Sequence, residues 1–367
     1  MIRIFKYKLT TMSIMQARMA IAAKIALMNN TLTALKGVQV GHASHPDELT
    51  GCTVILFDEN FPVAYKAYGG VPGTYNTENL RNGMSYANRD ALFIAGGSVN
   101  GLAASTHIIE KMIVMKRGLH VGETIIPSIS GAVVWDLSVG QGRFDPAYGA
   151  EAVAQCSYNT VPSGNVGAGT GTSVGKFSYT KEGLFLNMKA GVGSARVDVG
   201  GGVIVCALSV VNAMGNIIRP DGSILAGNRN NKTKPKFRSF HNMANSFNSK
   251  LSNTTITIIG TNADLGSREN YERVAHFATQ GQVRAIEPVH TSLDGDIVFV
   301  FSNQEVKNFS PLTKKDNLQG WPEVSVDLVG WAAAEATRLS VYEACTAAET
   351  IIYKPAFGGV IPGHKDY

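Results

Sequence analysis

Apolar runs separated by glycines and polar turns divide the chain into alternating strands and helices. Short, continuous or β-branched apolar runs predict buried strands. They lie at residues 52–57, 91–95, 132–137, 202–211, 254–260 and 295–302. Apolar residues at helical spacing predict helices that end near Gly118 and that span 146–156, 267–282 and 324–348. This irregular alternation favours layered sheets with helices outside.

The clearest strand signal is 254–260 (TTITIIG), where threonine and isoleucine alternate. Alternation gives the strand one apolar face and one face of hydroxyl groups. The strand follows residues 228–253, which are polar, rich in asparagine and basic. That composition predicts an exposed, mobile basic loop.

Composition allows a large folded core. Of the 367 residues, 44% are hydrophobic and 17% charged, which excludes disorder over the whole chain. The 39 glycines follow no fixed period, which excludes collagen. The net charge of +5 is small for this length and does not indicate a nucleic-acid partner.

The four cysteines are far apart in sequence and form no CxxC pair. This usage favours reduced thiols in the cytoplasm over a disulfide framework or a zinc site. No apolar stretch approaches the length of a membrane span. Polar residues interrupt the apolar N-terminal stretch, so residues 1–36 are interpreted as an amphipathic extension rather than a secretory signal.

The glycine-rich segment 164–176 (GNVGAGTGTSVGK) does not match a phosphate-binding loop. Thr170 stands where a P-loop needs its first glycine, and Phe177 where it needs serine or threonine. The alternative interpretation is backbone that must approach another segment closely. His42 and His45 lack a third ligand, so they do not predict a metal site.

The step from Asn253 to Thr254 joins the polar loop to the strong strand. A cut before Thr254 would free an α-amine of pKa about 8 on the residue that carries the hydroxyl. Such an amine is a general base near neutral pH, and the pair is a recognised activated nucleophile. Without a cut, the same step is a turn residue followed by a strand residue.

Several segments resemble one known family. Residues 252–262 (SNTTITIIGTN) are followed by 288–296 (PVHTSLDGD), and segments upstream match in the same order. Those upstream segments are 37–43 (GVQVGHA), 50–55 (TGCTVI), 168–176 (AGTGTSVGK) and 210–215 (VVNAMG). Together they resemble the nylon-oligomer (6-aminohexanoate-oligomer) endohydrolases, within the DmpA-type family of β-aminopeptidases. The resemblance runs from about Gly37 to the C-terminal helix.

The resemblance implies an α+β fold, a four-layer αββα sandwich similar to the N-terminal nucleophile hydrolases. It implies one domain over 37–367, cut between Asn253 and Thr254 into an α chain (1–253) and a β chain (254–367) that stay together. It further implies αβ units assembled as a homotetramer, and the chemistry needs no metal or organic cofactor. The charge balance and the short apolar runs indicate no nucleic-acid or membrane partner.

The resemblance also assigns roles to individual residues. Thr254 would be the agent of the cut and the nucleophile, with Asp294 and Asp296 orienting its hydroxyl and amine. The amide of Asn212 would donate to the oxyanion, a contact typically worth about 3–4 kcal/mol. Lys176 would hold developing negative charge or acidify a neighbour. The alternatives are an Asp-Gly turn, a strand-ending asparagine and a solvated lysine.

One position departs from the nylon-hydrolase branch, which has a tyrosine in the strand before an Asp-Phe-Ser step. The matching segment here is 133–138 (VVWDLS), which places Trp135 at that position. Tryptophan has no phenolic hydroxyl and accepts no hydrogen bond. Trp135 is therefore interpreted as an apolar wall for substrate.

The sequence thus predicts an autoprocessing N-terminal threonine amidohydrolase. Its substrates would be small linear amides, peptides or ω-amino acid oligomers. Two alternatives stay open: an acyltransferase similar to the ornithine acetyltransferases, in which an amine captures the acyl group, and an uncleaved, non-catalytic homologue.

Overall fold

A computed structural model describes residues 29–137, 139, 143–178, 186–230, 236–241, 253–307, 324–353 and 359–367. The chain divides into two units, Met1–Asn30 and Thr31–Tyr367. The second unit contains the sheets, helices and site described below. Most of the predicted N-terminal extension, most of the predicted basic loop and Ser138 lie outside the described residues.

A continuous ladder of strands runs in the order β10-β11-β14-β16-β2-β4-β7-β3, with β1 paired to β2. Its members are β1 (Val38–His45), β2 (Thr50–Ala67), β3 (Thr74–Tyr75), β4 (Asn88–Ala95), β7 (Ile129–Val133), β10 (Val192–Gly200), β11 (Val203–Asn212), β14 (Thr254–Ala263) and β16 (Ile297–Val306). The first half of β2 pairs with β1 and β4, and its last five residues pair with β16. This 18-residue strand therefore passes from one sheet into the other.

The longer helices are α2 (Ala104–Val114), α3 (Ala147–Ala154), α4 (Arg268–Ala285) and α5 (Val324–Thr346). Short strands are β5 (Leu119–Val121), β6 (Thr124–Ile126), β8 (Ser173–Val174), β9 (Met188–Lys189), β12 (Asn216–Ile218), β13 (Ile224–Ala226), β15 (Ile286–Glu287), β17 (Ile351–Tyr353) and β18 (Gly359–Ile361). Short 3₁₀ turns are η1 (Leu32–Ala34), η2 (Glu78–Leu80), η3 (Ser98–Ala103), η4 (Gly167–Gly169) and η6 (His364–Asp366).

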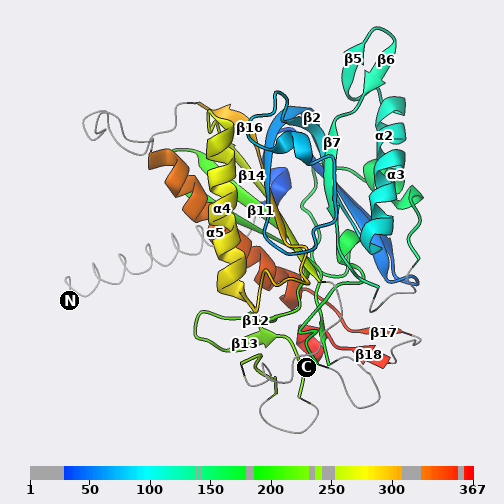
Figure 1. The fold of residues 1–367 in the computed structure, drawn as a ribbon, viewed down its shortest axis with the longest axis vertical. Helices are drawn as coiled ribbons and strands as arrows, with labels where there is room; N and C mark the ends of the chain where they lie inside the picture. The colour runs from blue at the N-terminus through cyan, green and yellow to red at the C-terminus, as the bar shows by residue number, and fades with distance from the viewer. Residues whose placement is uncertain are drawn as a thin grey trace, which may run out of the picture. The chain divides into compact units, whose positions relative to one another are not determined.

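Three apolar cores separate four layers. One core lies between the two sheets and includes Ile55, Leu92, Leu208, Ile256 and Phe299. A second joins β11, β14 and β16 to α4 and α5, and a third joins β2, β4 and β7 to α2 and α3. Figure 1 shows the two pairs of helices on opposite sides of the strands. The predicted αββα sandwich is confirmed.

Strand β14 shows why the alternating pattern matters. Ile256 and Ile258 face the core between the sheets. Thr257 faces the opposite way, where its hydroxyl accepts a hydrogen bond from Gln282 Nε2 on α4 at 3.1 Å. Because side chains alternate along a strand, Thr254 points to the sheet–sheet side at the start of β14.

Each predicted strand and helix overlaps one in the structure, with shifted ends, but of the strand expected at 132–137 only residues 132 and 133 lie in β7. The largest difference concerns β2, which was expected to end before Asp58. The polar residues Asp58, Glu59 and Asn60 resemble a turn, but the strand continues through them with a register shift between Leu56 and Phe61. Such a bulge lets polar residues interrupt the pattern without ending the strand.

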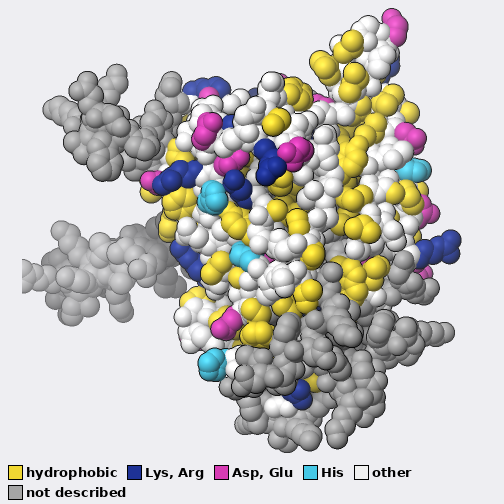
Figure 2. All heavy atoms as spheres, viewed as in Figure 1, with side chains coloured by type: hydrophobic (Ala, Val, Ile, Leu, Met, Phe, Trp, Pro, Cys, Tyr) yellow, Lys and Arg dark blue, Asp and Glu magenta, His cyan; other side chains and the backbone are white. Residues whose placement is uncertain are grey.

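The four cysteines are unpaired, as their spacing predicted. No helix among the described residues is long and apolar enough to cross a membrane. The space-filling view shows Lys and Arg side chains interspersed with Asp and Glu on the face it presents (Figure 2).

Candidate active site

The start of β14 brings three predicted site residues together. Thr254 is the first residue of β14 and pairs with Asn212, the last residue of the neighbouring β11. Asn253 forms a parallel bridge with Asp294, in the turn that precedes β16. Thr254 is only 5% exposed. A hydroxyl residue, an amide residue and a carboxylate residue thus meet where three strand ends converge.

The peptide bond between Asn253 and Thr254 is held from both sides. The Asn253 carbonyl accepts a hydrogen bond from Gly295 N–H at 2.7 Å, and Asn253 N–H donates to the Leu293 carbonyl at 2.8 Å. The Thr254 hydroxyl donates to the same Asn253 carbonyl oxygen. The hydroxyl therefore lies beside a carbonyl that a backbone N–H polarises.

The two aspartates fix the backbone around Thr254. Asp294 Oδ2 accepts from the N–H and the hydroxyl of Thr291 at 2.9 and 2.6 Å. Asp296 Oδ1 accepts from Thr255 N–H at 2.5 Å. Burial raises the pKa of Asp294, and the neighbouring charge of Asp296 raises it further. Among the described residues, neither carboxylate bonds to Thr254 itself.

Lys176 is attached to Asn212. Its Nζ donates to both the main-chain oxygen and Oδ1 of Asn212, each at 2.8 Å. Burial lowers the pKa of Lys176 to about 7, opposed by the negative charges of Asp294, Asp136 and Asp296. The alternative of a solvated lysine is wrong, because Lys176 is 1% exposed.

The orientation of the Asn212 amide is fully determined. Oδ1 accepts from Lys176 and, at 3.2 Å, from Ser173 N–H, so Nδ2 must point the other way. One N–H of Nδ2 donates to the Trp135 carbonyl at 2.7 Å. Trp135 therefore meets the predicted site through its backbone, and its partly exposed side chain makes no described contact with Thr254.

Asp136 is a site residue that the sequence reasoning missed. Its carboxylate accepts from Gly97 N–H at 2.8 Å and from the Thr50 hydroxyl at 2.7 Å. Burial raises its pKa to about 6. These bonds anchor the segment that presents the Trp135 carbonyl. The feature of the sequence that could have indicated Asp136 is its position directly after a buried apolar run.

The glycine-rich segment performs the close approach that was predicted. A Cβ on Gly171 would lie 1.8 Å from the Leu49 carbonyl oxygen. Gly175 has φ of +75°, a conformation that favours glycine, and its N–H donates to the Gly215 carbonyl at 2.9 Å. This backbone brings Lys176 to the end of β11.

The segment after β2 also contacts the site, and no sequence motif had indicated it. Tyr68 N–H donates to the Asp296 carbonyl at 2.9 Å, and Gly70 N–H to the Thr291 carbonyl at 3.1 Å. A Cβ on Gly69 would lie 2.1 Å from the Asp294 carbonyl oxygen. Two consecutive glycines allow this backbone to pack on the aspartate turn.

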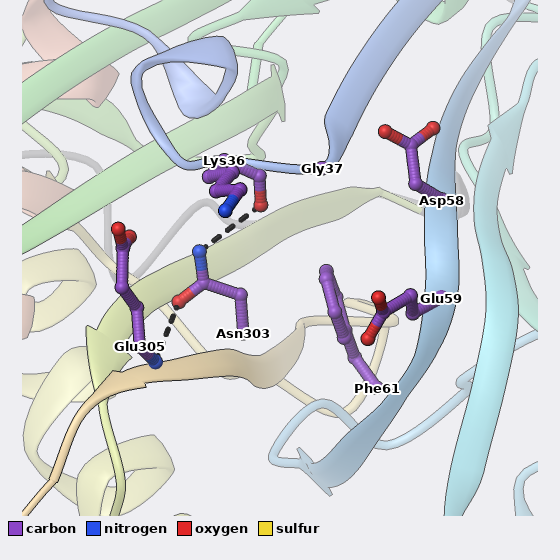
Figure 3. Close-up of a pocket in the computed structure, with 7 residues that line it drawn as sticks. All are labelled: Lys36, Gly37, Asp58, Glu59, Phe61, Asn303 and Glu305. Carbon is purple, nitrogen blue, oxygen red and sulfur yellow. Dashed lines mark hydrogen bonds between the residues drawn. The ribbon is translucent and has the colours of Figure 1, made fainter.

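The cavity in Figure 3 lies elsewhere. It has a volume of about 240 Å³ and is lined by Lys36, Gly37, Asp58, Glu59, Phe61, Asn303 and Glu305. Asn303 and Glu305 belong to the far half of β16, whereas Asp296 directly precedes that strand. No predicted site residue lines this cavity. Among the described residues, no group of three or more His, Cys, Asp or Glu side chains is placed to hold a metal ion.

Lys176→Met is expected to remove a pH-dependent part of the stability. The folded-state pKa of about 7 lies below the ordinary 10.5, so between these values the unfolded chain binds a proton that the folded chain does not. Stability from this group therefore rises with pH across that window. Denaturant unfolding in a Thr254→Ala background, from about pH 7 to about pH 10, should show the unfolding free energy of the Lys176 protein rising relative to the variant.

Lys189→Met is the matched control for activity. Lys189 is equally buried, and burial also lowers its pKa to about 7, but its Nζ donates to the Gly169 and Ala190 carbonyls. We expect turnover to survive Lys189→Met and to fail in Lys176→Met, because Lys176 Nζ orients the Asn212 amide. A pH-independent difference in unfolding free energy would contradict the lowered pKa of Lys176.

Comparisons with known proteins show what the chain is similar to. The sequence profile of peptidase family S58 matches residues 30–354. An uncharacterised aminopeptidase of Mycobacterium leprae (strain TN) is 32% identical, covering 91% of this chain and 95% of its own. A 6-aminohexanoate-oligomer endohydrolase of Paenarthrobacter ureafaciens is 27% identical, covering 84% of each. The solved L-aminopeptidase D-Ala-esterase/amidase of Ochrobactrum anthropi, a variant of the Ntn hydrolase fold, has a TM-score of 0.63 at 18% identity, covering 92% of each.

Proposed function

The chain belongs to peptidase family S58, and we propose that it is an autoprocessing amidohydrolase whose nucleophile is Thr254. Family and relatives make it a hydrolase of amide bonds, and the predicted resemblance is confirmed. The observation that supports Thr254 as the nucleophile is that the Asn253 carbonyl oxygen accepts hydrogen bonds from both the Gly295 N–H and the Thr254 hydroxyl.

Self-cleavage would begin with attack of Thr254 Oγ1 on the Asn253 carbonyl carbon. The Gly295 N–H, 2.7 Å from the carbonyl oxygen, would stabilise the oxyanion that forms. Collapse breaks the C–N bond, moves the acyl group to Oγ1 and places a proton on the departing nitrogen, which becomes the α-amine. Water then hydrolyses the ester, giving the Asn253 carboxylate and restoring the Thr254 hydroxyl.

The same hydroxyl would then attack substrate amides. The new α-amine would accept the hydroxyl proton and pass it to the leaving amine. One N–H of Asn212 is used by Trp135, and the second is engaged by no described residue, so we assign it to the substrate oxyanion. Asp294 and Asp296 would hold the backbone and stabilise the protonated amine. Water would release the acid from the acyl-enzyme.

The substrates we propose are small linear amides, peptides or ω-amino acid oligomers. The relatives are an aminopeptidase and a 6-aminohexanoate-oligomer endohydrolase, and Trp135 would supply an apolar surface for a methylene chain. No described residue is placed as a metal ligand in this scheme. In line with what the family resemblance implies, we propose that the αβ units associate as a homotetramer.

Intact-mass analysis of the purified protein tests the proposal. It should find two fragments, residues 1–253 and 254–367, and Edman sequencing of the smaller should begin at Thr254. Incubation with a 6-aminohexanoate oligomer or a β-amino-acid amide should release free acid without an added amine. Release that requires an amine acceptor would instead indicate an acyltransferase, and a chain that stays intact while active would overturn the role of Thr254.

Activity should fall on acidification. The α-amine acts as base only when unprotonated, and its reference pKa is about 8. We therefore expect kcat/KM to decrease about tenfold for each pH unit well below the amine pKa. The measurement is kcat/KM of the processed enzyme from about pH 5 to about pH 9. A rate that stays flat down to about pH 5 would argue against the amine as the base.

A further inference from the structure

The carboxylate of Asp296 is held by more donors than its neighbour. Oδ1 accepts from Thr255 N–H at 2.5 Å. Oδ2 accepts twice from one residue, from His290 N–H at 3.0 Å and from the ring Nδ1 of His290 at 2.9 Å. Asp296 is 1% exposed. A buried carboxylate in this position links the turn before β16 to the residue after the nucleophile.

Both ring nitrogens of His290 have hydrogen-bond partners. Its Nε2 lies 2.8 Å from the hydroxyl of Thr279 on α4. Its ring centroid lies 5.3 Å from that of Tyr68, whose hydroxyl is 2.7 Å from His276 Nδ1. The His290 backbone has φ of 57°, an uncommon left-handed conformation for a residue other than glycine. Such a conformation persists only where the surroundings over-determine it.

Thr279, His290 and Asp296 have the connectivity of a hydroxyl–imidazole–carboxylate triad. The proposed nucleophile is Thr254, so we give the Thr279 hydroxyl, which lies within α4 and bonds to His290 Nε2, no nucleophilic role. The roles therefore run in the opposite direction from those in a catalytic triad, in which the carboxylate positions the imidazole and the imidazole activates the hydroxyl. The imidazole, anchored by the hydroxyl, holds the carboxylate in place.

We infer that His290 is a positioning residue for Thr254, an inference that rests on the proposed function. By donating two hydrogen bonds to Asp296 Oδ2, His290 directs Oδ1 at Thr255 N–H and so fixes the first peptide units of β14. Thr254 Oγ1 must reach the carbonyl carbon within a narrow range of geometry, and small displacements in such sites cost about a hundredfold in rate. His290 acts through Asp296 and touches no reacting atom.

His290→Gly and His290→Asn test this role as a matched pair. Both residues accept positive φ, so backbone strain is similar, but only asparagine keeps a side-chain N–H close to the position of Nδ1. We expect His290→Gly to slow self-cleavage and to lower kcat by about 10–100-fold, with KM changed less than about threefold. His290→Asn should recover most of the loss.

The measurements are the rate of fragment appearance after rapid purification, and kcat and KM of the processed fraction. Cooperative unfolding of each variant in a Thr254→Ala background shows whether it folds. If His290→Gly fails that test, Thr279→Val supplies the readout, because it removes the anchor of Nε2 and should slow cleavage about two- to tenfold.

Wild-type rates in His290→Gly, or an asparagine variant as slow as the glycine variant, would overturn the inference. The first result would show that His290 is dispensable, and the second that its side-chain donor is not what matters. Failure of the wild-type protein to cleave at all is a different outcome, because it would remove the proposed function and not only this role of His290.

Discussion

Thr254→Ala is expected to leave a single full-length chain of 39.1 kDa and to abolish amide hydrolysis. Alanine has no hydroxyl to attack the Asn253 carbonyl, so neither the cut nor the acyl-enzyme can form. Loss of a nucleophile lowers kcat by at least about 10⁴-fold in comparable enzymes. Denaturing gels, intact mass and an amide assay with free-acid detection measure both effects in one preparation.

Two variants control for this result. Thr255→Val changes the adjacent threonine, whose Oγ1 is buried without a hydrogen-bond partner among the described residues, so cleavage should persist. Thr254→Ser keeps a hydroxyl at the critical position and should still cut, at a reduced rate. A Thr254→Ala chain that splits before residue 254, or a Thr255→Val chain that stays whole, would place the nucleophile elsewhere.

Asn212→Ala is expected to separate the cut from turnover. The carbonyl of Asn253 is polarised by Gly295 N–H, whereas we assign the substrate oxyanion to Asn212. The variant should therefore still produce both fragments, while kcat of the processed enzyme falls about 10²–10³-fold. Fragment yield and kcat, measured on the same sample, give the comparison.

Asn187→Ala is the control for loss of a buried amide near the site. Asn187 is also buried, and its Nδ2 donates to the Ser173 hydroxyl at 2.8 Å, but it does not pair with Thr254. Its kcat should stay within a few-fold of the wild type. Asn212→Ala also removes one acceptor from Lys176, so some loss of stability, about 1–3 kcal/mol, is expected. Equal losses of cleavage and turnover would show that both steps use Asn212.

The sequence predicted the layers of the fold because the alternation of its apolar residues is strong. The pattern at 254–260 and the apolar run at 295–302 correctly identified two central strands. It could not reveal that β2 runs on through Asp58–Asn60, because a bulge reverses the local pattern and depends on both neighbouring strands.

The candidate site was predictable where two short motifs supply it. Asn253, Thr254, Asp294 and Asp296 lie in motifs whose residue types suit the chemistry, and the structure brings them together. His290 lies inside a quoted motif, yet its role depends on α4 and on Tyr68, which only the fold places beside it. Burial decides such roles, and spacing alone does not reveal it.

Trp135 shows the limit of reasoning from side-chain chemistry. The sequence directed attention to its ring and to the missing phenol. In the structure its described bond to Asn212 is made by the main-chain carbonyl, which any residue would provide. The neighbouring Asp136, which received no role from the sequence, is what secures that carbonyl.

The strand order has a consequence for the cut chain. Strands β14 and β16 lie side by side in the ladder, flanked by β11 on one edge and by β2 on the other. Scission before Thr254 would therefore leave the C-terminal piece interleaved within the N-terminal piece, with hydrogen-bonded partners on both flanks. Each fragment produced alone would expose strand edges with unpaired backbone N–H and C=O groups, and such edges promote aggregation. A working enzyme should therefore form only when both fragments are synthesised and folded as one polypeptide before the cut.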